Sequence, residues 1–457
     1  MGFTMEDVCS SVERLPLELL LEIWRHLIPT SMQFHQKHAP FPLVVSWVNR
    51  RWRNFAVGAP ELWCYINVFL KQSSEFVDIQ LRRSQALPLS IAVDVPVDKA
   101  PENTVEHAQI VSHLNNLFTV LRQHLPRWQE FKASIHGSDP MSRFCPLYVN
   151  VTFQALQKAF APTLRRLHIH IGQPGVFIKI FTAGAPRLAH ASFRSISITK
   201  QIPHLIGLTS LSLDHVCLMP PAALQIIAVG CPTLSRLSFT GRCILSRGTP
   251  LREDTVIHFS ALLSLSLVET ILEIETVNDF GSGWPLVANC FPLFSAPNLL
   301  DLHIAKAGPK AMRVLYHALV TNASHSKFPL LSELHLYEVQ CTKAHVRDIC
   351  HCLPSIEILR VDDLGRLPRF ECLEALVPDA SVQANPVCPN LRLLSWVTTA
   401  PAKYLRGRMQ TLLQKRIVWD GPAVQLELSQ QAGVGKATDM DWIIAGEKAE
   451  ITRIPAC

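Results

Sequence analysis

Charged residues are scarce in this chain. Asp, Glu, Lys and Arg together account for 18% of the 457 residues, whereas hydrophobic residues account for 48%. This composition excludes a disordered chain, because such chains are rich in charge and poor in apolar residues. The formal net charge is only +6 and is spread along the chain, without the concentrated basic region that nucleic acids require. We therefore expect a folded protein with a large buried core and no nucleic-acid partner.

Long uninterrupted hydrophobic runs are also missing. The longest stretches without a charged residue, 215–235 and 280–300, each contain three prolines and would make poor membrane helices. The first residues include Glu6 and Asp7 and lack the apolar region of a secretory signal. The 13 cysteines follow no regular spacing, which favours reduced thiols over a disulfide framework. These features predict a protein of the cytoplasm, the nucleus or both, without a membrane partner.

The sequence lacks the usual signatures of catalysis. There is no G-x-S-x-G motif. The segment around 433–438 departs from a P-loop, because Gln430 stands where the first glycine is required and Ala437 stands where Ser or Thr is required. The His and Cys residues within 345–352 have no second pair of metal ligands near them in sequence. We therefore expect no metal, no cofactor and no enzymatic activity. An enzyme whose catalytic groups converge from distant loops of an α/β frame remains the alternative.

Two amphipathic segments stand at the N-terminus. In residues 15–27 the apolar side chains recur at helical spacing, and Pro16 falls in the first turn, where its missing N–H costs nothing. A second helix is predicted from Pro42 to Val57, because Gly58 and Pro60 form a stop signal. The sequence then alternates into a short strand after Trp63.

The order of these segments resembles the F-box motif in the form common in fungal proteins. The matching pieces are LPxELLxxIWxxL, VxxVNRRWRNFA and PELW, and they cover residues 15–63. The resemblance implies a three-helix unit that packs on the Skp-type adaptor of cullin–RING ubiquitin ligases. The loop from Ile28 to Phe41 is longer than in compact F-boxes. By resemblance, the adaptor-binding residues are Leu15, Pro16, Leu19, Leu20, Ile23, Val44 and Val48. The alternative is that the two helices only cap the end of a repeat domain.

A second pattern, L-x-x-L-x-L with other apolar residues allowed, recurs through the rest of the chain. Several intervals between copies lie in the range of about 20–29 residues that is typical of leucine-rich repeats. Many copies follow a proline, which ends a preceding helix and favours an extended entry into a strand. The first positions of the copies are Leu164, Leu188, Leu208, Leu234, Leu262, Leu299, Leu331, Ile356 and Leu391.

This pattern predicts an α/β fold in which the N-terminal helical F-box is followed by an irregular leucine-rich-repeat-like solenoid with parallel strands. Residues 85–95 and 128–135 are expected to add strands between the two parts. An α/β barrel or an open sheet of ordinary βα units is the alternative fold. The predicted parts are an F-box-like domain (1–70), a linking segment (71–160), the solenoid (161–402), a C-terminal cap with a helix at 403–416 (403–428) and a loosely ordered tail (429–457).

The strand positions that alternate with the buried leucines should form a polar surface. Solenoid proteins use such surfaces to bind protein ligands, although a merely solvated face is the simpler interpretation. Together with the F-box resemblance, this surface predicts the substrate receptor of a cullin–RING (SCF-type) ubiquitin ligase, with a protein substrate. A non-catalytic interaction scaffold is the alternative. The candidate substrate-binding residues are Arg166, His168, Arg236, His303, His335, Arg360 and Trp396.

Overall fold

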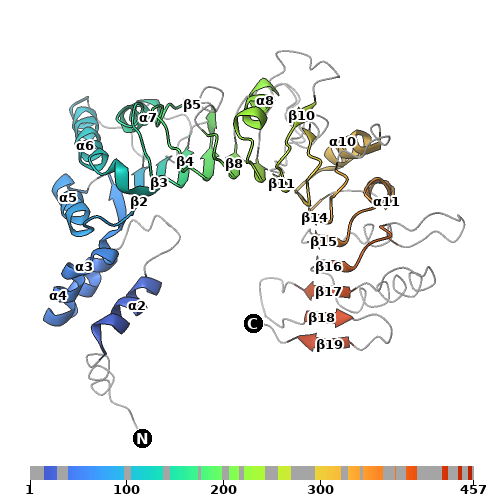
Figure 1. The fold of residues 1–457 in the computed structure, drawn as a ribbon, viewed down its shortest axis with the longest axis horizontal. Helices are drawn as coiled ribbons and strands as arrows, with labels where there is room; N and C mark the ends of the chain where they lie inside the picture. Colours follow the sequence, from blue (N-terminus) through green and yellow to red (C-terminus); the bar gives the residue numbers. More distant parts are fainter. Residues whose placement is uncertain are drawn as a thin grey trace, which may run out of the picture. The chain divides into compact units, whose positions relative to one another are not determined.

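The structure is a computed structural model, and it describes most of the strands and helices of the chain (Figure 1). Its described residues are 15–27, 40–70, 72–96, 104–136, 145–172, 176–197, 205–215, 221–241, 256–268, 294–320, 328–339, 343–363, 376, 388–398, 425–430, 441–444 and 451–454. The predicted helix at 403–416 lies outside these residues. The chain divides into two compact units, Met1–Leu205 and Ile206–Cys457, and each is considered by itself.

The first unit begins with a small helical part, which we call the three-helix unit. It comprises α2 (Leu17–Leu27), α3 (Phe41–Ser46), α4 (Arg50–Gly58) and the 3₁₀ turn η1 (Pro60–Trp63). The prediction of one helix from Pro42 to Val57 was wrong, because the chain breaks at Asn49. The backbone of Asn49 is extended, and its side chain accepts a hydrogen bond from the Trp52 N–H at 2.7 Å. Asn49 therefore starts a new helix, since a side-chain acceptor at this position satisfies an N–H that has no partner within the helix.

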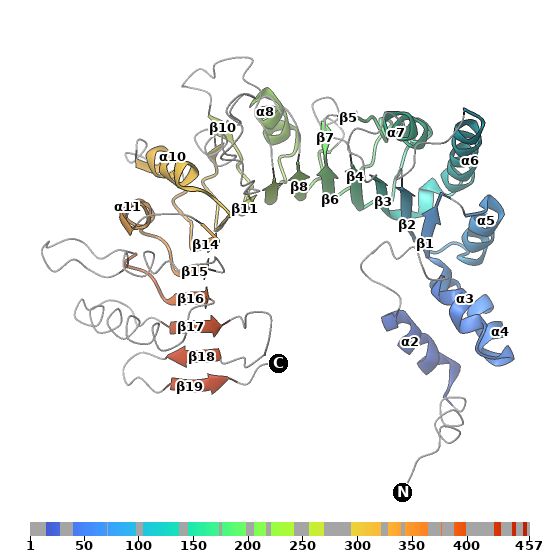
Figure 2. The ribbon, with the colours of Figure 1, turned by 180° about the vertical axis from the view of Figure 1, so that it is seen from behind.

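Parallel strands follow the helical part in the first unit. They are β1 (Tyr65–Phe69), β2 (Leu89–Pro96), β3 (Trp128–His136), β4 (Arg166–Ile171) and β6 (His190–Arg194), each paired with the next. Three helices connect the earlier strands: α5 (Ser74–Arg83), α6 (Thr104–Arg122) and α7 (Cys145–Gln154). All three lie on the same side of the strands in Figures 1 and 2. The two strands predicted within 85–95 and 128–135 are thus confirmed as β2 and β3.

Smaller elements complete the first unit. They are the 3₁₀ turn η2 (Leu125–Arg127) and the short parallel pair β5 (Val176–Phe177) and β7 (Ile196–Ser197). The guanidinium of Arg83, at the end of α5, lies 4.5 Å from the ring centroid of Trp63 in η1. This cation–π contact helps to join the three-helix unit to the first strand–helix unit of the sheet.

The second unit continues the same architecture. Its parallel strands are β8 (Ser210–Asp214), β9 (Arg236–Thr240), β11 (Ser264–Val268), β13 (Asp301–Ala305), β14 (Glu333–Tyr337), β15 (Ile358–Asp363), β16 (Leu393–Thr398) and β17 (Gln425–Gln430). Its connections contain α8 (Pro221–Gly230), α10 (Pro309–Val320), α11 (Lys343–Cys352) and the short strands β10 (Ile257–His258) and β12 (Phe294–Ser295). Antiparallel strands β18 (Asp441–Ile444) and β19 (Ile451–Ile454) follow, within the segment expected to be a loosely ordered tail.

The apolar positions of the sequence pattern lie in register across neighbouring strands. Each copy of the pattern overlaps a strand, and within each unit its second position faces the same position of the next strand, as Leu237 faces Leu265 and Leu265 faces Leu302. These leucines are buried, and so is the first position of every copy, from Leu164 to Leu391. The predicted mixed α/β fold with a large parallel sheet is therefore confirmed. None of the helices that the structure describes is long and apolar enough to cross a membrane.

A repeated turn ends many of the strands. The residue directly after the strand has a positive φ angle at Ser195, His215, Gly241, Lys306 and Glu338. In four of these turns the same residue donates its backbone N–H to the neighbouring strand, for example from Lys306 to the Tyr337 carbonyl at 2.7 Å. Left-handed backbone costs about 1 kcal/mol for most side chains, so the added hydrogen bond between strands offsets it. In these four turns the chain thus leaves the sheet while its backbone keeps a hydrogen bond to the neighbouring strand.

We predict that Leu265→Ala destabilises the protein far more than Leu263→Ala. Leu265 is fully buried between Leu237 and Leu302, whereas Leu263, two residues earlier, is exposed. The free energy of unfolding should fall by about 2–5 kcal/mol for the buried site and by less than about 0.5 kcal/mol for the exposed one. Chemical denaturation followed by circular dichroism measures both. Equal losses in the two variants would contradict the assignment of the buried face.

Candidate functional site

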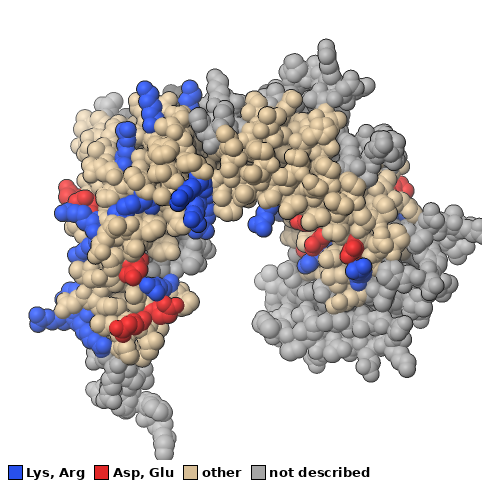
Figure 3. All heavy atoms as spheres, in the orientation of Figure 1, with Lys and Arg blue, Asp and Glu red and all other residues tan. Residues whose placement is uncertain are grey.

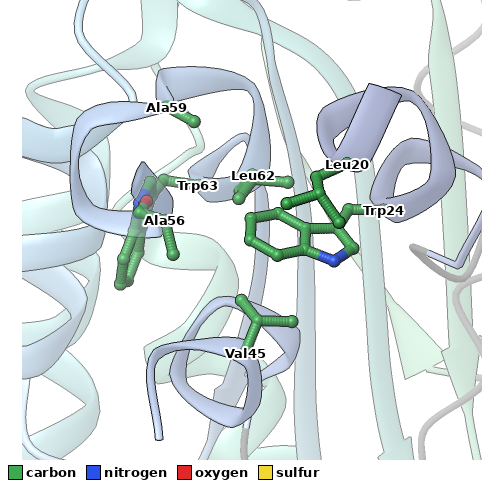
Figure 4. Packing of buried hydrophobic residues seen from close by; sticks show 7 residues of the cluster. All are labelled: Leu20, Trp24, Val45, Ala56, Ala59, Leu62 and Trp63. Atoms are coloured by element: carbon green, nitrogen blue, oxygen red, sulfur yellow. The ribbon is translucent and has the colours of Figure 1, made fainter. Parts of the chain in front are cut away.

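The three-helix unit has an apolar core of its own. Leu20 and Trp24 of α2 point toward Val45 of α3 and Leu62 of η1 (Figure 4). The ring of Trp24 meets that of Trp52 edge-on, with centroids 5.2 Å apart. Such aromatic pairs contribute about 0.5–1.5 kcal/mol beyond the burial of their surface. The core therefore uses only one side of α2, the side that carries Leu20 and Trp24.

A stripe of exposed apolar side chains runs along another side of α2. Leu19, Ile23 and Leu27 follow one another at intervals of four residues, and all three are exposed. At this spacing, side chains stand one above the other on a helix. We call Leu19, Ile23 and Leu27 the α2 stripe. Because none of them belongs to the core, the stripe is not needed to hold the three-helix unit together.

The end of α3 adds a second group of exposed apolar side chains. Val44, Trp47 and Val48 are exposed, and Trp47 is 65% accessible. Trp47 lies where the chain leaves α3, between Ser46 and the extended backbone of Asn49. Sequence reasoning did not assign Trp47 to a site, because a continuous helix was expected there. An exposed tryptophan beside two valines is unusual on a surface that needs no partner.

The predicted adaptor-binding residues divide into two groups in the structure. Pro16, Leu19, Ile23, Val44 and Val48 are exposed and Leu15 is half-buried, so each is open at least in part to a partner. Leu20, by contrast, is 2% accessible and lies in the core. The periodicity of α2 could not separate the two roles, since its apolar residues cover more than one face. Leu27 continues the α2 stripe, and sequence reasoning did not include it among the candidates.

Polar contacts hold the helices beside the stripe in place. Arg25 of α2 lies 3.2 Å from Glu22 and 3.3 Å from Glu61 of η1. Arg51 of α4 donates a hydrogen bond to the Leu15 carbonyl at 2.8 Å. These groups are exposed, so each contact contributes little stability, but together they tie η1 to α2 and α4 to the residues just before α2. The apolar stripe is thus bordered by charged side chains, as is usual for protein interfaces.

In the second unit, three of the predicted substrate-binding residues meet on neighbouring strands. His303 on β13 faces His335 on β14 in the strand register, and His335 faces Arg360 on β15. The two imidazole rings stand edge to face with centroids 5.7 Å apart. His335 Nε2 and Arg360 Nε both lie near Glu333 Oε1, at 2.9 and 3.0 Å. Sequence reasoning did not assign Glu333, which joins these residues into one group.

The remaining predicted substrate-binding residues do not join that group. Arg236 is exposed on β9, between Ser210 and Ser264 in the strand register. Trp396 is 1% accessible and belongs to the sheet's buried row beside Val361. Its place in the L-x-x-L-x-L pattern, at the last apolar position, is the signal that predicts burial. Arg166 and His168 lie on β4 in the first unit.

Burial lowers the pKa of His303, one of the two histidines. The pKa of His303 is lowered from its usual value, first by burial and then by the neighbouring His335, while Asp301 and Asp362 act in the opposite direction. The pKa of Asp362 is raised by burial, although His335, His303 and Arg360 oppose the shift. The group therefore combines partly buried acidic and basic side chains whose charges act on one another. Such an arrangement suits binding of polar protein groups.

A serine, a histidine and an aspartate also meet in the first unit, but not as a catalytic triad. The Ser134 hydroxyl lies 3.0 Å from His136 Nδ1, and Asp94 lies 3.3 Å from the same nitrogen. In a triad the two groups contact opposite nitrogens of the ring. Among the described residues, no group of three or more His, Cys, Asp and Glu side chains is placed to hold a metal ion.

Comparison of the sequence with protein-family models finds no matching family, and comparison with curated proteins finds no matching relative.

We predict that Trp24→Ala unfolds the three-helix unit, whereas Trp47→Ala leaves it folded. Trp24 is buried against Trp52 and Phe55, so its loss should cost about 3–5 kcal/mol, while the exposed Trp47 should cost less than about 0.5 kcal/mol. Limited proteolysis with mapping of the cleavage sites to residues 15–63 measures the difference. Rapid cleavage of both variants would show that Trp47 is structural and is not available to a partner.

We predict that the free energy of unfolding falls as the pH drops below about 6.5, the usual histidine pKa, and that His303 contributes to the loss. Its pKa is lowered in the folded protein, so the unfolded chain takes up the proton first and is stabilised by it. The His303→Asn variant should therefore lose less stability than the wild type between about pH 7.5 and about pH 5.5. Denaturant midpoints at the two pH values test this. An unchanged pH dependence in the variant would contradict the lowered pKa.

Proposed function

We propose that this protein is the substrate receptor of a cullin–RING (SCF-type) ubiquitin ligase. In this proposal the three-helix unit is an F-box that binds a Skp-type adaptor, and the parallel strands belong to a leucine-rich-repeat-like solenoid that binds the protein substrate. The receptor catalyses no reaction. It holds the substrate near the ubiquitin-charged enzyme and so raises the local concentration of the two reactants.

One observation carries the proposal: the three-helix unit exposes apolar side chains that its own core does not use. The core is made by Leu20 and Trp24, whereas Leu19, Ile23 and Leu27 face away from it. Exposed apolar groups of this kind on a small unit are typical of a protein-binding surface. The order of the motif LPxELLxxIWxxL, VxxVNRRWRNFA and PELW supports a Skp-type adaptor as the partner.

The alternative function, a scaffold whose helices only cap the sheet, accounts for less of the surface. A cap has to cover the apolar end of the sheet, and η1 together with the contact between Trp63 and Arg83 lies next to the first strand. That contact leaves the α2 stripe without a role. The exposed Trp47 is likewise unused by a cap, because it is among the most accessible large apolar side chains described. The adaptor-binding function therefore explains more of the described residues.

Co-expression with a Skp-type adaptor, followed by size-exclusion chromatography, tests the proposal. The wild type should elute as a complex, and Leu19→Asp/Ile23→Asp should not, because the complex would bury two unpaired carboxylates. We expect the affinity to fall by more than about a hundredfold, from two groups that each cost about 1–3 kcal/mol or more. The matched control is Ile79→Asp, which changes an exposed apolar residue of α5 and should retain the complex.

Circular dichroism of each variant separates loss of binding from loss of folding. A folded double variant without the complex is the expected result. A folded wild type that forms no complex, or a double variant that binds as well as the wild type, would remove the support for adaptor binding.

A further inference from the structure

The outward face of β3, β4 and β6, in the first unit, gathers basic and histidine side chains. Neighbouring strands lie about 4.8 Å apart, so residues in register form rows across the sheet. Figure 3 shows Lys and Arg side chains over the β4 region of this unit. The rows across β3, β4 and β6 are Glu130, Arg166 and His190, then Lys132, His168 and Ser192, then Ser134, His170 and Arg194, with His136 next along β3. We call this set the basic strand face.

The acidic groups of the basic strand face lie deeper than its basic groups. The Glu130 side chain is 16% accessible and lies 3.3 Å from Arg166, whose side chain is 51% accessible. Asp94, on the adjoining strand β2, is 1% accessible and lies 3.3 Å from His136. Both carboxylates are thus shielded by a basic neighbour. A molecule that approaches this face meets Arg166, Arg194 and His190 first, because all three are exposed.

His168 lies among several of these basic groups. The pKa of His168 is lowered first by burial, and Lys132, Arg166 and His190 lower it further, while only Glu130 acts in the opposite direction. The pKa of Lys132 is also lowered by burial, against the effect of Glu130 and Asp94. Lys132, Arg166 and His190 therefore disfavour the charged form of His168. An anion placed over them would relieve this repulsion and would accept hydrogen bonds from several donors.

Neighbouring contacts keep parts of the face rigid before any ligand binds. The rings of His136 and His170 stack in parallel planes with centroids 6.4 Å apart. The Ser134 hydroxyl lies 3.0 Å from Nδ1 of His136 and 3.4 Å from Nδ1 of His170. Side chains that are held in position lose little conformational freedom on binding, which favours affinity. The strands beneath them are parallel and fully paired, so the donors keep fixed spacings.

From this charge complementarity, we propose that the basic strand face binds an acidic peptide segment, rich in Asp and Glu, of a protein partner. Only three Lys and Arg residues lie on the face, which is few for a nucleic-acid surface. Carboxylates suit the mixture of guanidinium, ammonium and imidazole donors. Identifying this segment as part of a ligase substrate rests on the proposed function, but binding of the peptide does not.

Fluorescence anisotropy with the full-length protein and a labelled peptide rich in Asp and Glu tests the proposal. The control peptide carries Asn and Gln at the same positions. We expect binding of the acidic peptide alone, weakening as salt rises, because exposed charges are screened beyond about 10 Å at 0.1 M. In Arg166→Glu/Arg194→Glu, binding should weaken roughly tenfold or more, since two attractive contacts become repulsive.

Matched variants make the result specific. Arg122→Glu reverses an exposed charge at the end of α6, in the helical layer, and should leave peptide affinity unchanged. Should the double Glu variant fail to fold by circular dichroism, Arg166→Gln/Arg194→Gln removes the same charges without adding acids and should also weaken binding. Equal affinity of wild type and either folded double variant would overturn the proposal. The absence of peptide binding to the wild type at low salt would also overturn it. A single-stranded RNA that displaces the labelled peptide at lower concentrations than the unlabelled peptide does would overturn it as well.

The proposal and the ligase function fail separately. Leu19→Asp/Ile23→Asp should bind the acidic peptide as the wild type does, and Arg166→Glu/Arg194→Glu should still bind the Skp-type adaptor. Peptide binding without an adaptor complex would leave the basic strand face as a protein-binding surface and remove only its assignment to a ligase. An adaptor complex without peptide binding would leave the ligase function in place and remove the basic strand face as a peptide-binding surface.

Discussion

The register of buried apolar residues from one parallel strand to the next is the constraint on which the rest of the structure depends. One strand with its helix or loop has too little apolar surface to be stable alone, so it must pack on its neighbours. Leu237, Leu265 and Leu302 satisfy this by meeting in one row, and Phe239, Leu267 and Ile304 form the next row. Because side chains alternate along a strand, burying these rows leaves the intervening positions outside the core. Those positions are then available for recognition.

The same separation of roles occurs in the three-helix unit. Leu20 and Trp24 form the core, while the α2 stripe lies outside it. Substitutions on the stripe can therefore change binding without unfolding the unit. In the first unit the side chains of Glu130 and Asp94 are largely buried, whereas the side chain of Arg166 is exposed.

Patterns that repeat were predictable from the sequence, and single local breaks were not. The L-x-x-L-x-L copies predicted strands β4, β6, β8, β9, β11, β13, β14, β15 and β16, because burial on one face imposes a fixed alternation. The break at Asn49 was missed, since one capping residue inside an apolar pattern gives a weak signal. The burial of Leu20 could not be predicted, because α2 is apolar on more than one side. Contacts such as those of Glu333 with His335 and Arg360 join residues far apart in sequence, so no local pattern predicts them.

Hydrogen–deuterium exchange of the full-length protein, with and without a Skp-type adaptor, tests the central claim most directly. Backbone amides exchange slowly where a partner restricts local opening, so exchange reports the binding surface residue range by residue range. The account predicts added protection in α2 and α3, around Leu19, Ile23 and Val44, and unchanged exchange in the strands of the second unit. Unchanged exchange in α2 and α3, with the adaptor in excess, would contradict the claim that the exposed apolar residues of the three-helix unit bind it.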